Sequence, residues 1–212
     1  MEKRDKIIKY GCSGMFSDEL DKMGYRDQVI SGLRMNNIFG KIYGKARTVK
    51  IKTVKTADEK IRVGLGFLEQ LNKGEILCVQ GSREFAYFGE LMSRLSLRRK
   101  VGGVVVGGLT RDTLFTNTIT ELTIFAEGYS PKDIKGRGCV EATDVVIKIG
   151  KVSIKPNDLI YGDSDGVVVI PEKAKDELEI RILRCISAEK DIISSINNGD
   201  GIDVILKAHK EF

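Results

Sequence analysis

The stretch that most constrains the fold of this chain is residues 89–112, GELMSRLSLRRKVGGVVVGGLTRD. Its apolar core, residues 104–106, has a pair of glycines on each side, and the stretch ends in the charged pair Arg111 and Asp112. The pattern predicts a helix, then a buried strand, then a glycine-rich turn that presents the two charges. Neighbouring arginine and aspartate residues are also common on exposed loops, so a plain surface role is the alternative interpretation.

The helix predicted after Gly89 begins with an acidic residue, Glu90. The first amides of a helix have no intrahelical acceptor and lie at its positive end, which suits them to binding an anion. We therefore expect the backbone N–H groups of Leu91 and Met92 to be available to a substrate carboxylate. Glu90 also has a simpler explanation, because acidic residues are favoured in the first turn of a helix.

Helical and strand patterns alternate along the rest of the chain, and nothing resembles an internal repeat or a linker. This alternation predicts an α/β protein, and the length favours a single domain over residues 1–212. The predicted elements are a helix capped by Ser17 and ending at Gly24, a strand at 46–55, a helix capped by Asp58, a strand at 75–81, a turn with partial helix at 82–88, a strand at 121–128, a β-meander at 144–171 and a long helix at 172–197.

The composition argues against several classes of function. The net charge is only +5, the chain has no tryptophan, and basic residues are not interleaved with aromatic ones, so we expect no nucleic-acid binding. The four cysteines lack CxxC spacing and the single histidine is His209, which disfavours a zinc site or a histidine-dependent nucleophile. No apolar run is long enough to cross a bilayer and the first 16 residues lack a signal-peptide core, so we expect a cytoplasmic protein without membrane contact.

Four motifs in register resemble a known family. An acidic residue, 20 intervening residues and an Arg-Asp pair are the signature of the class II pyruvate aldolases, typified by 4-hydroxy-4-methyl-2-oxoglutarate aldolase. These enzymes share a fold with RraA, the regulator of ribonuclease E activity. The other motifs are ELDKMG at 19–24, GKARTVKIK at 44–52 and GDSDGVVVIP at 162–171, which are similar to the family's DALD helix, GPAxTV strand and DDDGVVVVP hairpin. The resemblance implies a β/β/α layered sandwich of the RraA type, related to phosphohistidine swivelling domains.

The resemblance also implies a metal-dependent carbon–carbon lyase. Such enzymes cleave a 4-hydroxy-2-oxo acid to pyruvate through an enolate, and decarboxylation of oxaloacetate leaves the same enolate. By resemblance, Asp112 is a ligand of Mg²⁺ or Mn²⁺, Arg111 contacts the substrate and stabilises the enolate, and Glu90 holds a water and assists proton transfer. Mg²⁺ keeps several waters and needs only one or two carboxylates, so this kind of site requires no histidine cluster.

A site shared between subunits is a further implication of the resemblance. The family takes one glutamate from the long C-terminal helix of an adjacent subunit. By its spacing to Gly199, Glu189 is the better match and Glu179 the poorer one, although a solvated helix charge explains Glu189 equally well. We therefore expect a homotrimer or a dimer of trimers that acts on a small 2-oxo acid.

The chain departs from the family pattern at two positions. Glu90 is one methylene longer than the usual aspartate, and Gly107 stands where the family has the acid of an Asp-Gly pair, which would alter activity if that acid bridges Arg111 or a metal-bound water. RraA proteins lack the complete acid and Arg-Asp set and inhibit ribonuclease E, so a non-catalytic regulator is the alternative function. Asp163 and Asp165 favour a hairpin turn over a calcium loop, because the further acids of an EF-hand are missing.

Overall fold

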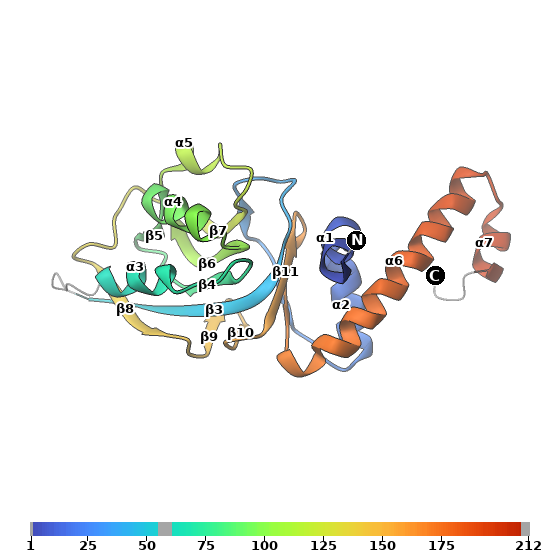
Figure 1. The fold of residues 1–212 in the computed structure, drawn as a ribbon, viewed down its shortest axis with the longest axis horizontal. Coiled ribbons are helices and arrows are strands. Elements are labelled where there is room, and N and C mark those ends of the chain that lie inside the picture. The colour runs from blue at the N-terminus through green and yellow to red at the C-terminus, as the bar shows by residue number, and fades with distance from the viewer. Residues whose placement is uncertain (1, 55–60, 209–212) are drawn as a thin grey trace.

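The 12-residue strand β3 (Ile42–Thr53) connects two sheets into one continuous structure (Figure 1). The computed structural model describes residues 2–54 and 61–208. The first part of β3, which includes Tyr43, pairs antiparallel with β11, and from Ala46 onward the strand pairs parallel with β4. The strand starts earlier than the predicted 46–55 because its first residues pair with β11, a partner more than 100 residues away in the sequence.

The elements in chain order have the following bounds. The helices are α1 (Lys3–Tyr10), α2 (Ser13–Lys22), α3 (Ile61–Glu69), α4 (Glu90–Arg99), α5 (Thr113–Thr116), α6 (Lys175–Asn197) and α7 (Ile202–Ala208), with a 3₁₀ turn η1 (Glu172–Ala174) before α6. The strands besides β3 are β1 (Val29–Ile30), β2 (Arg34–Met35), β4 (Ile76–Gln80), β5 (Ala86–Phe88), β6 (Gly103–Thr110), β7 (Ile124–Tyr129), β8 (Gly138–Thr143), β9 (Ile147–Ile149), β10 (Val152–Ile154), β11 (Leu159–Asp163) and β12 (Gly166–Ile170).

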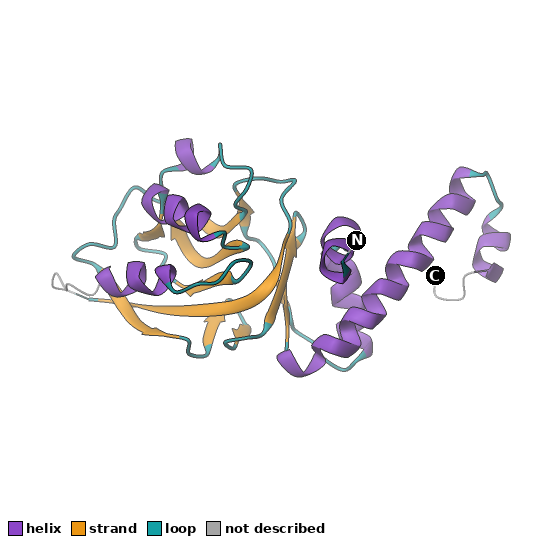
Figure 2. Ribbon diagram, in the orientation of Figure 1, coloured by secondary structure: helices purple, strands orange, loops and turns teal. Residues whose placement is uncertain are grey.

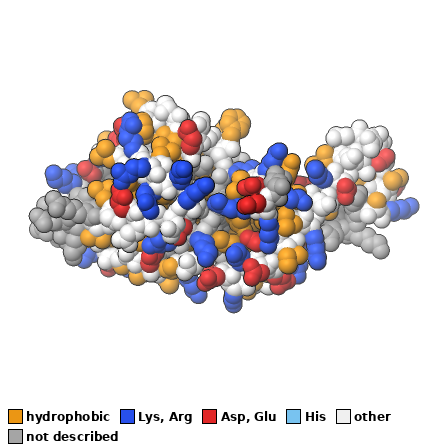
Figure 3. All heavy atoms as spheres, viewed as in Figure 1, with side chains coloured by type: hydrophobic (Ala, Val, Ile, Leu, Met, Phe, Trp, Pro, Cys, Tyr) orange, Lys and Arg blue, Asp and Glu red, His pale blue; other side chains and the backbone are white. Residues whose placement is uncertain are grey.

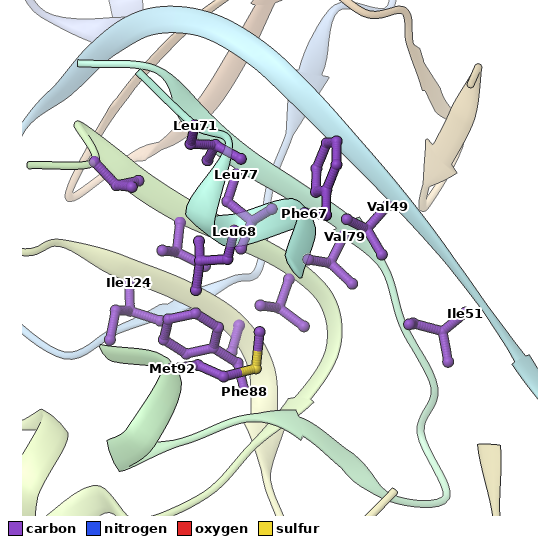
Figure 4. Close-up of a cluster of buried hydrophobic side chains, with 14 of the residues drawn as sticks. Val49, Ile51, Phe67, Leu68, Leu71, Leu77, Val79, Phe88, Met92 and Ile124 are labelled. Carbon is purple, nitrogen blue, oxygen red and sulfur yellow. The ribbon is translucent and has the colours of Figure 1, made fainter. Parts of the chain in front are cut away.

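The parallel strands β3, β4, β6 and β7 carry the first hydrophobic core on one face, beneath α3 and α4 (Figures 1 and 2). The predicted apolar run of β6 contributes Val104 and Val106 to this core, and α4 contributes Met92. Figure 4 shows Met92 lying against Phe88 of β5. Packing of this kind holds the start of α4 close to the carboxyl end of β6.

A second core lies on the opposite face of the same strands. The β9–β10 hairpin places Ile147 and Ile149 there with Val105 of β6, so β6 is buried on both faces. A third cluster joins α1, α2 and α6 to the outer face of β11 and β12, around the stacked rings of Phe16 and Tyr161. These layers of helices and sheets confirm the predicted α/β class and the layered fold.

Several local predictions were wrong or incomplete. α1 was not predicted because KRDKIIKY buries only Ile7 and has little apolar periodicity. α2 begins at Ser13 rather than after Ser17, since Asp163 accepts the Ser13 N–H group at 2.7 Å. Residues 86–88, predicted to be a turn with partial helix, form strand β5 by pairing with β6. Gly107 and Gly108, predicted to lie in a turn, are part of strand β6. The predicted cap Asp58 lies outside the described residues.

The long C-terminal helix is confirmed as α6, preceded by the 3₁₀ turn, and it carries α7 away from the sheets (Figure 1). In the residues described, no helix combines the length and apolar character needed to cross a membrane. Basic and acidic side chains are interspersed on the face drawn in Figure 3.

Candidate active site

Helix α4 begins where it does because an aspartate at the end of a neighbouring strand caps it. The Glu90 N–H group donates to Asp112 Oδ2 at 2.9 Å, across 22 positions of sequence. Gly89 is the N-cap residue and has no side chain with which to do this. A Cβ atom at position 89 would overlap the Asp112 carboxylate, so the close approach of Asp112 to the helix requires glycine there.

The Asp112 backbone has the left-handed conformation, with φ 60° and ψ 42°, which aspartate tolerates better than most residues. Just before it, the Arg111 N–H group donates to the Phe88 carbonyl at 2.9 Å, which fixes the end of β6 beside β5. The Asp112 side chain is 39% exposed, and its second oxygen, Oδ1, has no hydrogen-bond partner among the described residues.

Two carboxylates hold the Arg111 guanidinium. Its Nη1 atom lies 3.2 Å from Asp133 Oδ2, and its Nε atom lies 3.5 Å from Asp112 Oδ2. Sequence reasoning missed Asp133, which follows Pro131 in a loop between β7 and β8. The charges of that loop, KDIK, were the only signal, and nothing in their spacing links them to Arg111.

The Glu90 carboxylate is paired along its own helix. Its Oε1 atom accepts from Arg94 Nε at 2.8 Å and lies 2.7 Å from Arg94 Nη2. The Arg94 guanidinium lies over the Phe115 ring, 4.2 Å from its centroid. The longer side chain at position 90 is therefore held at the cavity mouth by an arginine one turn away.

These groups surround one cavity of about 240 Å³. Its walls include five of the predicted site residues besides Gly89, namely Glu90, Leu91, Met92, Arg111 and Asp112, together with Leu65, Tyr87, Asp133, Ile134, Lys135 and Val140. A second hollow, lined by α5 and by residues 129–131, shares Glu90, Arg111 and Asp112 with it. These six predicted residues thus line one cavity, while their chemical roles stay predictions.

Tyr87 is a wall residue that the sequence analysis did not identify. Its hydroxyl oxygen is buried and has no hydrogen-bond partner among the described residues. Burial raises the pKa of the Tyr87 phenol, so the group stays protonated at neutral pH. Nothing in the sequence distinguishes this tyrosine from one that packs in a core.

Gly107, which stands where the family has an acid, lies away from this cavity. A Cβ atom at Gly107 would be 2.9 Å from Ile149 Cγ1, in the second core. In this chain a side chain at 107 would therefore point to the opposite face of the sheet from α4, and Asp133 is the additional acid that contacts Arg111.

The two glutamates considered on the C-terminal helix are not in this cavity. Glu189 lines a separate hollow with residues of α2, including Asp18 and Lys22. Glu179 accepts from the Tyr43 hydroxyl at 2.5 Å and pairs with Lys3 at 2.5 Å, which is a structural role. Within one chain, therefore, neither glutamate approaches Arg111.

The donor set fits a hard divalent cation that keeps most of its waters. No three Asp, Glu, His or Cys side chains in the described parts of the chain lie close enough to form an all-protein metal site. Mg²⁺ needs only one or two carboxylates, and Asp112 offers an oxygen atom without a partner at an open cavity. Asp112 would hold the ion, with Glu90 near its waters.

Comparison with known proteins identifies the family. Residues 14–169 match the model of the RraA-like family, described as Aldolase/RraA. The chain belongs to the RraA-like family. A Bacillus cereus protein, provisionally named as a 4-hydroxy-4-methyl-2-oxoglutarate aldolase, is 35% identical over 124 residues, which cover 57% of this chain and 75% of that protein. The 4-hydroxy-4-methyl-2-oxoglutarate aldolase of Thermus thermophilus is 29% identical over 138 residues, 64% of this chain and 82% of that protein.

The fold is also similar to that of a solved structure from this family. The crystal structure of Streptomyces coelicolor RraAS2, described as an unusual member of the RNase ES inhibitor RraA protein family, superposes with a TM-score of 0.77 at 25% identity. The match covers 88% of this chain and 92% of RraAS2. The family resemblance inferred from the four motifs is confirmed, and the RraA-like family contains relatives named as enzymes and relatives named as inhibitors.

Proposed function

We propose that this protein is a divalent-metal-dependent class II aldolase that cleaves a 4-hydroxy-2-oxo acid, of the 4-hydroxy-4-methyl-2-oxoglutarate type, to pyruvate. The observation that carries the proposal is the convergence of Arg111, Asp112 and the start of α4 on one cavity. The names of the relatives support a carbon–carbon lyase of this kind. Decarboxylation of oxaloacetate is proposed for the same site, because both reactions produce the enolate of pyruvate.

Substrate binding begins at the start of α4. Asp112 already accepts the Glu90 N–H group, so the next two amides, of Leu91 and Met92, are the ones left for the substrate carboxylate. Arg111 then meets the keto oxygen. Its guanidinium is held by Asp112 and Asp133, so little ordering is needed when the substrate arrives.

Cleavage breaks the C3–C4 bond and leaves its electron pair on the pyruvate half as an enolate. The fixed positive charge of Arg111 stabilises the enolate more than the neutral ketone, which lowers the barrier. When bound at Asp112, a divalent cation supplies further positive charge for the same purpose. Glu90, through a water, accepts the proton of the C4 hydroxyl and returns a proton to C3.

A second subunit is proposed to complete the site with Glu189. α6 and α7 extend beyond the sheets (Figure 1), and several of their apolar side chains are exposed, including Ile193, Ile196, Ile202 and Val204. Exposed apolar side chains gathered on a projecting element favour packing against another protein surface. We expect a homotrimer or a dimer of trimers by light scattering, and a monomer at micromolar concentration would exclude a shared site.

The direct test is pyruvate release from 4-hydroxy-4-methyl-2-oxoglutarate and from oxaloacetate, first with Mg²⁺ or Mn²⁺ and then with excess EDTA. We expect pyruvate from both substrates and its loss with EDTA. Comparing the two metals also shows which one supports the faster reaction. Pyruvate formation that is unaffected by EDTA would contradict the metal assignment at Asp112.

A protein-binding regulator of the RraA type is the second candidate, and the match to RraAS2 favours it. Arg111 and Asp112 would then be only structural groups at the end of β6. The test is binding to ribonuclease E and inhibition of its cleavage, with an Arg111→Ala variant beside the wild type. Inhibition by both proteins, together with no pyruvate from either substrate, would favour the regulator over the aldolase.

A further inference from the structure

Among the described residues, the charged side chains that line the Arg111 cavity are paired with one exception. Each lining carboxylate lies within 3.5 Å of an arginine nitrogen, and the pairs are Glu90 with Arg94, Asp112 with Arg111 and Asp133 with Arg111. The remaining lining charge is Lys135, whose ammonium group has no carboxylate partner in the part of the chain that the structure describes. Lys135 is exposed, so a molecule in the cavity can reach that group.

The backbone holds Lys135 in a tight turn beside the cavity. The Arg137 N–H group donates to the Ile134 carbonyl at 2.8 Å, which closes a four-residue turn with Lys135 in second place. Gly136, in third place, has φ 73°, which glycine adopts without strain. Just before the turn, the Ile134 side chain is buried in the first core and Asp133 forms a β-bridge to strand β5. Water satisfies most exposed lysines, and what distinguishes Lys135 is this fixed place at the cavity.

The binding mode proposed above uses the other positive groups for the pyruvate half of the substrate. The C1 carboxylate meets the free amides at the start of α4, and Arg111 meets the C2 keto oxygen. A substrate of the 4-hydroxy-4-methyl-2-oxoglutarate type carries a second carboxylate, attached to C4. Moving that charge from water into a cavity is unfavourable unless a cation lies beside it. Lys135 is the lining cation that no carboxylate of the described chain already occupies.

We propose that the Lys135 ammonium group binds the second carboxylate of the substrate, the one attached to C4, and so gives the site a preference for dicarboxylic 4-hydroxy-2-oxo acids. This inference rests on the proposed aldolase function and assigns the residue that selects the substrate within it. Lysine suits the role because its charge lies at the end of a flexible stem, which can follow the carboxylate as the C3–C4 bond breaks. The products are pyruvate and a second 2-oxo acid, which keeps that carboxylate.

Lys135 is a binding residue that transfers neither electrons nor protons. The C3–C4 bond breaks and its electron pair remains on the pyruvate half. The C4 hydroxyl loses its proton and becomes the carbonyl of the second 2-oxo acid, and C3 takes up a proton, so no oxidant or reductant is required. The second carboxylate has the same charge in the substrate and in the transition state. Loss of Lys135 should therefore raise KM and leave kcat nearly unchanged.

The test compares two substrates of nearly the same shape that differ in one charge, 4-hydroxy-4-methyl-2-oxoglutarate and its C5 amide, each followed by the substrate consumed. For the wild type we expect kcat/KM to be roughly tenfold higher for the dicarboxylate, as one charge-assisted hydrogen bond at an exposed site predicts. In Lys135→Met, which keeps the apolar stem and loses the charge, this preference should disappear through a rise in the KM of the dicarboxylate. Lys135→Arg should keep most of it. The change in the ratio between proteins is decisive, because it cancels the intrinsic reactivities of the two substrates.

Lys132→Met is the matched control, because Lys132 is an exposed lysine of the same loop that does not line the Arg111 cavity. It should leave both kcat/KM values unchanged, and both methionine variants should keep the wild-type thermal midpoint, since each side chain is exposed. An unchanged ratio in Lys135→Met, or an equal fall for both substrates, would overturn the inference, while pyruvate release by the wild type upholds the proposed function. No pyruvate from the wild type with either substrate or with oxaloacetate would overturn both.

Discussion

Asp112 and Asp163 lie at the ends of different strands, and each accepts the first N–H group of a helix far away in sequence. Asp112 Oδ2 accepts from Glu90 at the start of α4, and Asp163 Oδ2 accepts from Ser13 at the start of α2, at 2.9 and 2.7 Å. Both interactions satisfy an amide that the helix itself leaves free, and both place a negative charge at the positive end of the helix.

The surroundings of the two aspartates differ. Asp163 is buried, and its other oxygen accepts from the Ser13 hydroxyl at 2.7 Å and from the Asp165 N–H group at 3.1 Å. Asp112 is partly exposed at the cavity, and its other oxygen has no hydrogen-bond partner in the described chain. The same residue type can therefore complete a fold in one region and remain available to a ligand in another. Asp112 differs from Asp163 in its exposed side chain and in having one carboxylate oxygen without a hydrogen-bond partner among the described residues.

The largest effect expected from this comparison is on activity at Asp112. In Asp112→Asn the amide oxygen can still accept the Glu90 N–H group, but the negative charge that a hard cation requires is gone. We expect kcat/KM for pyruvate release to fall roughly 100-fold or more, with a thermal midpoint close to that of the wild type. A titration with Mg²⁺ should show weaker activation by the metal.

Asp112→Ala is the matched variant, because it removes the cap as well as the charge. It should lose as much activity and, in addition, about 1 kcal/mol of unfolding free energy, which denaturant titration measures. If Asp112→Asn released pyruvate at close to the wild-type rate, Asp112 would be a capping residue and no more, as Asp163 is.

Asp163→Ala should show the opposite pattern. The variant leaves the Ser13 N–H and hydroxyl groups buried without their acceptor, so we expect a loss of about 2 to 3 kcal/mol in unfolding free energy. The kcat/KM of the protein that remains folded should stay within about twofold of the wild type, since Asp163 does not line the Arg111 cavity. A selective loss of activity with normal stability would break the contrast between the two aspartates.

The same contrast shows what the sequence could predict. The resemblance of the Glu90, Arg111 and Asp112 spacing to the family signature identified groups that line the cavity. The structure explains why they meet, because β5 and β6 on either side of α4 are parallel, and a helix followed by a parallel strand returns the chain to the same edge of the sheet. Asp133 and Tyr87 were missed, since their approach depends on the loop before β8 and on the pairing of β5 with β6. The start of α2 was misplaced because Asp163, its cap, is 150 residues away.

Gly89→Ala tests how closely Asp112 must approach its helix. The added methyl group would overlap the Asp112 carboxylate and displace it from the Glu90 N–H group. We expect activity to fall roughly tenfold and the unfolding free energy to fall by about 1 kcal/mol, as for the loss of a cap.

Gly66→Ala on α3 is the control for this change, because a Cβ atom there meets nothing within 4 Å. Alanine is the better helix former, so this variant should gain up to about 1 kcal/mol in unfolding free energy. Full activity in Gly89→Ala would show that the carboxylate position is not critical.

The smallest expected effect concerns how the carboxylates of the two regions are held in place. Burial fixes Asp163, whereas Glu90 at the cavity is oriented by Arg94 through an exposed ion pair, which salt screens. In Arg94→Met we expect kcat to fall about threefold and the unfolding free energy to change by less than about 0.5 kcal/mol. High salt should reduce the wild-type kcat by a similar factor and affect Arg94→Met much less. An equal response of both proteins to salt would mean that the orientation of Glu90 does not depend on this pair, and that screening acts instead on Arg111 or on the substrate carboxylate.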